Sequence, residues 1–172
     1  MKYKQKLAPF ILTFVIVLAD QLSKAFIVSR WPREGTFIKD VFGNDLLWII
    51  HVRNKAIAFS LGEGLPDQVR ALLFIIIPLV VLGVLLVYYF KTDEFTNLQH
   101  WIVAGIVGGG LGNLIDRIWR PDGVVDFISV NVYGFLGFAR WPTFNVADSS
   151  VVICGILLVI SMLLVSKNTR KE

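Results

Sequence analysis

Four long runs of apolar residues dominate this sequence of 172 residues. Each run has about the 20 residues that an α-helix needs to cross a hydrocarbon core of roughly 30 Å. The runs cover approximately residues 9–28, 71–90, 98–118 and 146–165. Charged residues make up only 17% of the chain, whereas soluble domains carry about 25%. The sequence therefore predicts an all-α membrane protein with four spans, and it excludes a soluble globular domain and a disordered tail.

The positive charge of the chain gives no reason to expect a nucleic-acid partner. The net charge is +4, but Lys and Arg lie at the chain ends and in the loops and form no basic stripe. Lysines also precede the first apolar run, a pattern shared with cleavable signal peptides. We expect a retained helix instead, because no small-x-small cleavage site follows the run and DQLSK (residues 20–24) interrupts it.

An even number of spans puts both tails of the chain on the same side of the membrane. The density of Lys in the tails favours the cytoplasm for both, although the loops on the other side carry more Lys and Arg in total. Tryptophans are typical of the membrane–water interface. Those outside the predicted spans are Trp31, Trp48, Trp119 and Trp141, which fall just beyond span ends or in the connecting loops.

The two longer connections predict a small β-cradle on the outer face, built from residues 29–70 and 119–145. The first connection contains LLWIIHV (46–52) followed by RNKAIAFSL (53–61), and the second contains VVDFISVNVYGF (124–135). These segments are rich in the β-branched and aromatic residues that favour strands. Nothing marks a second domain, so we expect residues 1–172 to form one integral membrane domain.

The sequence predicts neither a metal nor an organic cofactor. Cys154 is the only cysteine and lies deep in the fourth apolar run, where packing is a commoner role than nucleophilic attack. His51 and His100 lie in separate segments and form no cluster with metal-ligand spacing. The chain also lacks a phosphate-binding loop and a Ser-His-Asp pattern. Carboxylates remain as the candidate reactive groups.

Ionisable groups within spans are expensive, so each is a functional hypothesis. Asp20 and Lys24 are four residues apart and share a helix face, as a structural ion pair or as participants in substrate chemistry. Asn113, Asp116 and Arg117 share a face near the end of the third run, and both a structural pair and a substrate-orienting cluster remain open there. Overlapping GxxxG patterns in the same run predict close helix packing.

Two further aspartates stand in contrasting surroundings. Asp126 lies in the apolar strand segment VVDF, which disfavours its charged form. Asn145 is expected to cap the fourth helix and to put Asp148 in its first turn, where the helix dipole favours a carboxylate. Taken alone, Asp148 favours the simpler interpretation of an acidic residue in a helix cap. Together, one neutral and one ionised carboxyl are what an aspartyl protease requires.

Five short motifs resemble, in the same order, those of bacterial lipoprotein signal peptidases, also called signal peptidase II. They are DQLSK (20–24), NKAIAFS (54–60), GGGLGNLIDR (108–117), VVDF (124–127) and FNVADS (144–149). Each motif alone is weak, but five in order together with four spans are highly specific. The resemblance covers nearly the whole chain.

The resemblance implies a bacterial inner-membrane aspartyl endopeptidase without a cofactor, with a β-cradle on the outer face. Such an enzyme removes the signal peptide from prolipoproteins whose cysteine carries diacylglycerol, and globomycin-type peptides inhibit it. The implied catalytic dyad is Asp126 and Asp148. The implied supporting and substrate-binding residues are Asn54, Asn113, Asp116, Arg117 and Asn145, with Asp20 and Lys24 as structural or binding residues.

Two departures from the family pattern are visible. Ala56 and Ile57 stand where Gly and Ala are usual, which predicts a cradle loop of different shape. The segment NVYGFLGFAR (131–140) predicts a longer surface loop between the two aspartates. The alternatives are a small proton-coupled carrier that uses Asp20, Lys24 and Asp116 as a relay, and a noncatalytic membrane scaffold.

Overall fold

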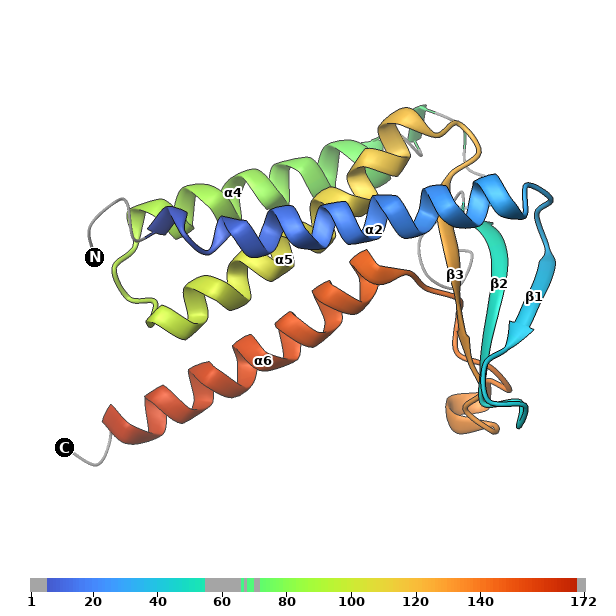
Figure 1. The fold of residues 1–172 in the computed structure, drawn as a ribbon. Helices are drawn as coiled ribbons and strands as arrows, with labels where there is room; N and C mark the ends of the chain where they lie inside the picture. The colour runs from blue at the N-terminus through green and yellow to red at the C-terminus, as the bar shows by residue number, and fades with distance from the viewer. Residues whose placement is uncertain (1–5, 55–65, 67, 70–71, 170–172) are drawn as a thin grey trace.

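The computed structural model of the chain describes residues 6–54, 66, 68–69 and 72–169. Long helices run alongside one another, and a small sheet stands across one end of the bundle (Figure 1). The elements in chain order are α2 (Phe10–Arg30), β1 (Thr36–Asp40), β2 (Leu47–Asn54), the π-helical turn η2 (Leu72–Ile76), α4 (Ile77–Lys91), α5 (Asn97–Trp119), β3 (Val124–Val130), the 3₁₀ turn η3 (Phe135–Gly137) and α6 (Val146–Thr169).

Four helices in the described part of the chain are long and apolar enough to cross a membrane. Their bounds agree with the predicted spans to within a few residues at each end. The start of α2 and the end of α6 lie at the same end of the bundle, opposite the sheet (Figure 1). The predicted four-span architecture is therefore confirmed.

Local chemistry explains where α5 begins. The side chain of Thr96 accepts a hydrogen bond from the backbone N–H of Gln99, and the Gln99 side chain accepts one from the N–H of Thr96. This capping box satisfies two otherwise unpaired donors at the start of α5. Pro78 lies where the π-helical turn η2 passes into α4, inside the continuous helix Leu72–Lys91.

Helix α5 is the centre of the bundle. About two-thirds of its apolar stretch is buried (67%), whereas none of the corresponding stretch of α6 is. Glycines on α5 make this packing possible, because Gly108 faces α2, Gly109 faces α6 and Gly112 faces both. The close packing predicted from the GxxxG patterns is confirmed. Cys154 packs against Gly105 in the same interface.

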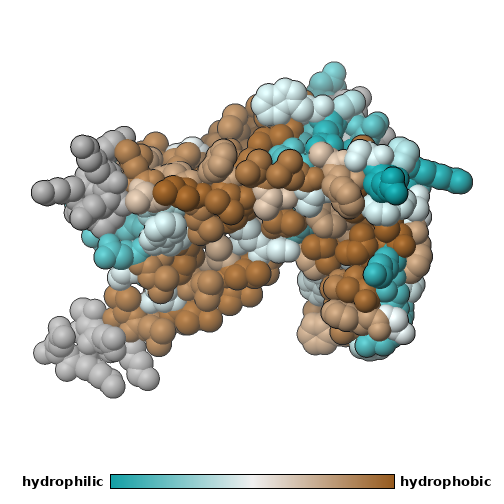
Figure 2. Space-filling view, viewed as in Figure 1, coloured by the Kyte–Doolittle hydropathy of each residue, from teal (hydrophilic) through white to brown (hydrophobic). Residues whose placement is uncertain are grey.

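The outward faces of the helices are apolar, as expected of a protein that a bilayer surrounds. Figure 2 shows brown, apolar atoms along the sides of the helices, with teal groups gathered toward the ends of the molecule. On α4 and α6, Val84 is 65% exposed and Leu163 is 66% exposed. Hydrocarbon chains, rather than water, are the solvent that suits these faces.

The sheet is antiparallel, with strand order β1-β2-β3. It is fixed to the end of α2 by a small apolar cluster in which Ile27 meets Val125 and Phe127. Strand β2 lies within the predicted strand region, but β1 was not predicted, because TFIKD is short and weakly patterned. The expected continuation of β2 through residues 55–61, including Ala56 and Ile57, lies outside the described residues.

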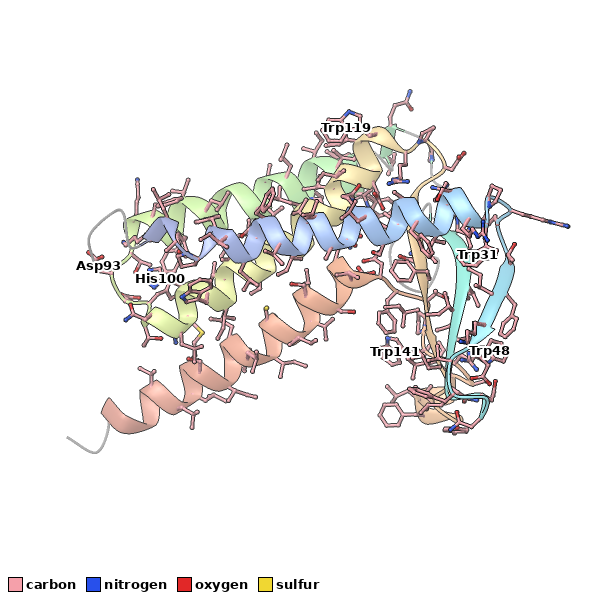
Figure 3. All side chains as sticks on the ribbon, in the orientation of Figure 1. Trp31, Trp48, Asp93, His100, Trp119 and Trp141 are labelled. Atoms are coloured by element: carbon pink, nitrogen blue, oxygen red, sulfur yellow. The ribbon has the colours of Figure 1, made fainter. Side chains whose placement is uncertain are left out.

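Strand β3 ends at Val130, five residues before the end of the predicted segment. The residues that follow form a tight turn that includes η3. Trp31, Trp48, Trp119 and Trp141 all lie toward the sheet end of the molecule, whereas Asp93 and His100 lie at the other end (Figure 3). This placement agrees with the predicted aromatic band on the side of the cradle.

Replacing Gly109 with Ala should destabilise the protein by about 1–3 kcal/mol, because overpacking forces neighbouring atoms to move. A methyl group there would overlap the carbonyl oxygen of Ala147 and the side chain of Val151. Gly83→Ala on α4 is the matched control, since its Cβ would meet nothing within 4 Å. Thermal unfolding in detergent micelles measures both variants. Equal melting temperatures for the two would contradict the packing argument.

Candidate active site

A cavity of about 590 Å³ lies where the sheet meets α5 and α6. Its polar wall contains Asn54, Asn113, Arg117, Asp126, Asp148 and Ser149. The rest is apolar or aromatic and includes Val124, Val130, Val132, Trp141, Pro142, Phe144, Val152 and Ile153, together with Thr143. The cavity therefore combines a few polar groups with a large apolar wall, as most small-molecule and peptide sites do.

Asp126 and Asp148 reach this cavity from different elements. Asp126 comes from the middle of β3 and is 2% exposed, and Asp148 comes from the first turn of α6. Asn145 touches both of them. Its side-chain amide donates to Asp126 Oδ1 at 2.7 Å, and its side-chain oxygen accepts from the backbone N–H of Asp148 at 3.0 Å.

The predicted cap of α6 is thus present, and it is reciprocal. The backbone N–H of Asn145 donates to Asp148 Oδ2 at 3.1 Å, so cap residue and carboxylate satisfy each other. Each aspartate also accepts a hydrogen bond from one further side-chain amide. Asn54 donates to Asp126 Oδ2 at 3.0 Å, and Asn113 donates to Asp148 Oδ1 at 2.7 Å. Each of the four carboxyl oxygens therefore accepts a hydrogen bond, and these bonds fix the orientation of both carboxyl groups.

The two carboxyls differ in their surroundings. Burial and the negative charge of Asp148 raise the pKa of Asp126 to about 7, against the opposing effect of the Asn54 and Asn145 amides. Asp148 is less deeply buried and lies at a helix N-terminus, where the dipole favours an ionised carboxylate. The sequence predicted contrasting surroundings for the two carboxyls, and the structure places Asp126 in the more deeply buried position.

A buried ion cluster lies behind the cavity. Lys24 Nζ is 2.8 Å from Asp20 Oδ2 and 2.9 Å from Asp116 Oδ2, and all three side chains are fully buried. The cluster is closed by Arg120, which reaches Asp116 Oδ1 at 3.0 Å. Asp20 Oδ1 also accepts from the backbone N–H of Ala147, which ties α2 to the start of α6. The predicted Asp20–Lys24 ion pair is present.

One amide connects the ion cluster to the cavity. Asn113 Oδ1 accepts from Lys24 Nζ at 3.0 Å and from the Asn145 amide at 3.1 Å. With its oxygen engaged in this way, Asn113 must turn its NH₂ group toward Asp148. Lys24 therefore acts on the orientation of the Asp148 carboxyl through a neighbour.

The structure separates the predicted supporting residues into two groups. Asn54, Asn113 and Arg117 line the cavity, whereas Asp20, Lys24 and Asp116 belong to the cluster behind it. Asn145 is fully buried between the two groups. The carrier alternative expected Asp20, Lys24 and Asp116 to relay protons. They form a compact, closed cluster instead.

Sequence reasoning did not single out Gln21 or Arg120. The Gln21 amide donates to Asp20 Oδ2, to Asp116 Oδ1 and to the Gly112 carbonyl oxygen. The signal for Gln21 was a neutral polar residue inside an apolar run, next to Asp20. The signal for Arg120 was its position four residues after Asp116 on the same helix.

These features define a class of protein: a four-helix membrane protein with a pair of amide-linked carboxyls in a cavity beneath a small sheet. A family model described as signal peptidase (SPase) II matches residues 12–164. A protein called lipoprotein signal peptidase from Treponema pallidum is 42% identical over 98% of this chain and 90% of its own length. A protein of the same description from Borrelia turicatae is 43% identical over 92% of this chain and 91% of its own.

A solved structure described as a bacterial membrane enzyme superimposes on the chain with a TM-score of 0.77 and 27% identity. It covers 95% of this chain, and 92% of the solved chain is matched. The chain belongs to the signal peptidase II family of membrane proteases. The family resemblance read from the five sequence motifs is confirmed.

Replacing Lys24 with Met should destabilise the protein by about 3–5 kcal/mol, because removing one partner leaves buried charges uncompensated. Asp20 and Asp116 would then face each other without the ammonium between them. Lys39→Met on the exposed face of β1 is the control, and thermal unfolding in micelles is the measurement. Adding Asp20→Asn to Lys24→Met should recover part of the loss. A Lys24→Met protein as stable as Lys39→Met would contradict the argument that Lys24 compensates the buried charges of Asp20 and Asp116.

Proposed function

We propose that Asp126 and Asp148 are the catalytic dyad of an aspartyl endopeptidase that removes the signal peptide from prolipoproteins whose cysteine carries diacylglycerol. The observation that carries this proposal is the meeting of the two carboxyls in one cavity, each held by two amide donors and joined through Asn145. The relatives called lipoprotein signal peptidase support the substrate class.

The chemistry follows from the unequal surroundings of the two carboxyls. Ionised Asp148 takes a proton from a water molecule, and the resulting hydroxide attacks the scissile carbonyl carbon. Protonated Asp126 donates a hydrogen bond to the carbonyl oxygen and stabilises the negative charge that develops there. When the tetrahedral intermediate collapses, the C–N bond breaks and the leaving amine receives a proton from the dyad. The two carboxyls are then left sharing one proton, as at the start.

The polar residues around the dyad hold it and the substrate in place. Asn54, Asn113 and Asn145 fix the directions of the carboxyl oxygens, so little reorganisation is needed during reaction. Arg117 lines the cavity and is held to the Asn113 carbonyl oxygen at 3.3 Å. We assign its remaining donors to the backbone carbonyl groups of the substrate, and Asp116 supports the site through the ion cluster behind it.

The lipid surroundings suit such a substrate. Val152 and Ile153 of α6 line the cavity and are also exposed on the lipid-facing surface, by 58% and 57%. Apolar chains of a diacylated cysteine can therefore stay in the bilayer while the peptide bond meets the dyad. The proposed location is the bacterial cytoplasmic membrane, with both termini cytoplasmic and the cavity near the outer face. Globomycin-type peptides are expected to inhibit the protein by lodging between the two aspartates.

Replacing either aspartate with Asn should lower the rate of cleavage by at least about 10²–10⁴-fold, because Asn keeps the shape but cannot transfer a proton. The assay uses purified protein and a diacylated prolipoprotein. Asp122→Asn is the matched control, since Asp122 is an exposed carboxyl just before β3. A wild-type rate in Asp126→Asn or Asp148→Asn would refute the dyad. If none of the three variants changed the cleavage rate, the result would favour a noncatalytic scaffold.

The pH profile should follow the proton on Asp126. Since the pKa of Asp126 is raised to about 7, the carboxyl keeps its proton below that pH and loses it above. The value of kcat/KM should therefore fall as pH rises through about 7. Asn54→Ala removes a hydrogen bond that lowers the pKa of Asp126. The fall of kcat/KM with pH should therefore occur at a higher pH in this variant. Asp122→Asn should leave the pH of this fall unchanged, and an unchanged pH in Asn54→Ala would contradict the assignment.

A further inference from the structure

A stretch without any charged residue separates Asp126 from Arg140. Its last nine residues, 131–139, fold back on themselves after β3, and we call them the apolar finger. The backbone N–H of Val132 donates to the Ala139 carbonyl oxygen, and that of Gly134 donates to Phe138. Below them, the N–H of Trp141 donates to the Val130 carbonyl oxygen and closes the base. The finger is an ordered hairpin-like extension of the sheet.

Three large side chains at the tip of the finger are turned outward. Tyr133 is 72% exposed, Phe135 is 62% exposed and Leu136 is 70% exposed. The backbone at Tyr133 and Leu136 has φ of 50° and 52°, a left-handed conformation that non-glycine residues rarely adopt. A loop that holds bulky residues in such a conformation and leaves their side chains uncovered suggests an apolar environment around the tip.

The base of the finger is held firmly, so the exposure of the tip is not a result of fraying. Arg140 donates to the Ser129 hydroxyl at 2.8 Å and to its carbonyl oxygen at 2.9 Å. The same guanidinium is 3.0 Å from Asp45 Oδ1 and lies 3.8 Å from the centre of the Trp48 ring. The Asn131 amide also donates to Asp45 Oδ2. These contacts fix the direction in which the finger points.

The position of the finger relative to the helices indicates what surrounds its tip. The sheet extends sideways beyond the bundle, past the start of α6, so its far end overhangs the space beside that helix (Figure 1). Brown, apolar atoms occur at this end of the sheet as they do along α6 (Figure 2). A bilayer that surrounds the exposed face of α6 therefore comes up against the finger. Its lack of charge makes entry into the lipid inexpensive.

We propose that the apolar finger inserts Tyr133, Phe135 and Leu136 into the lipid leaflet on the side of the sheet. The side chains would reach roughly 5–10 Å into the boundary between headgroups and acyl chains, the depth of interfacial segments. Tyr suits this boundary, because its ring is apolar and its hydroxyl is polar. This second attachment, in addition to the helices, holds the sheet at a fixed height above the membrane. Val132 and Trp141 near the base of the finger line the cavity, so the attachment also fixes this part of the cavity wall. The proposal does not depend on the catalytic assignment.

A fluorescent label tests the depth of the tip. The full chain carries Cys154→Ala and a single new cysteine, Leu136→Cys, bearing an environment-sensitive fluorophore, in vesicles of phosphatidylcholine and phosphatidylglycerol. Lys39→Cys on the exposed face of β1 is the aqueous control, and Ile156→Cys on the lipid-facing surface of α6 is the membrane control. Insertion predicts iodide quenching at residue 136 at least about fivefold weaker than at residue 39. Lipids with a nitroxide on a shallow chain position should quench residue 136 more strongly than residue 156, which lies about 15 Å along α6.

A second protein shows whether the native side chains cause the insertion. It carries Phe135→Ser and Leu136→Ser, with the label moved to Tyr133→Cys, and its iodide quenching should rise toward that of residue 39. The same label at Tyr133→Cys without the serines should remain protected. Iodide quenching at residue 136 equal to that at residue 39 overturns the proposal. Protection that disappears when the protein is diluted in lipid also overturns it, because the cover would then be a second copy of the chain.

Discussion

A single buried ammonium group organises the centre of this protein. Lys24 of α2 lies between Asp20 and Asp116 at 2.8 and 2.9 Å and donates to Asn113, with no exposure to solvent. A buried ion pair is stable only when its hydrogen-bonding groups are satisfied, and here Arg120, Gln21 and the backbone N–H of Val125 also donate to Asp116. The cluster therefore requires α2 and α5 to meet at one rotation and one height. The cavity and both of its aspartates depend on that registration.

Asn145 fixes the positions of the two aspartates in the cavity. It is the cap of α6, the amide donor to Asp126 and the acceptor for the backbone of Asp148. Because these roles fall on one side chain, the start of the helix and the distance between the two carboxyls are set together. Asn113 joins this unit to Lys24 from the other side. The site is thus built on element ends and a strand interior that packing has already fixed, rather than on mobile loops.

Much of this could be predicted from the sequence, because the bilayer imposes strict lengths and penalises isolated charge. The four spans, the close packing at the glycines and the Asp20–Lys24 pair followed from periodicity and spacing. The short strand β1 did not, because its pairing with β2 stabilises a segment whose own pattern is weak. The separation of Asp116 from Arg117 also escaped prediction. Neighbours in a helix point in different directions, so Asp116 meets Lys24 in the cluster whereas Arg117 lines the cavity.

The hydrogen bond from the backbone of Ala147 to Asp20 has a consequence for biosynthesis. Asp20 belongs to the first of the four long helices in chain order, and Ala147 belongs to the fourth. Asp20 and Lys24 of α2 interact with groups of α5 and α6, which follow later in the chain. During synthesis, α2 therefore carries these two charged side chains before their partners in α5 and α6 are present. Both aspartates of the cavity come from the last third of the sequence. A chain that ends before β3 therefore lacks both carboxyls of the cavity, and the cavity forms only when α6 has joined the bundle.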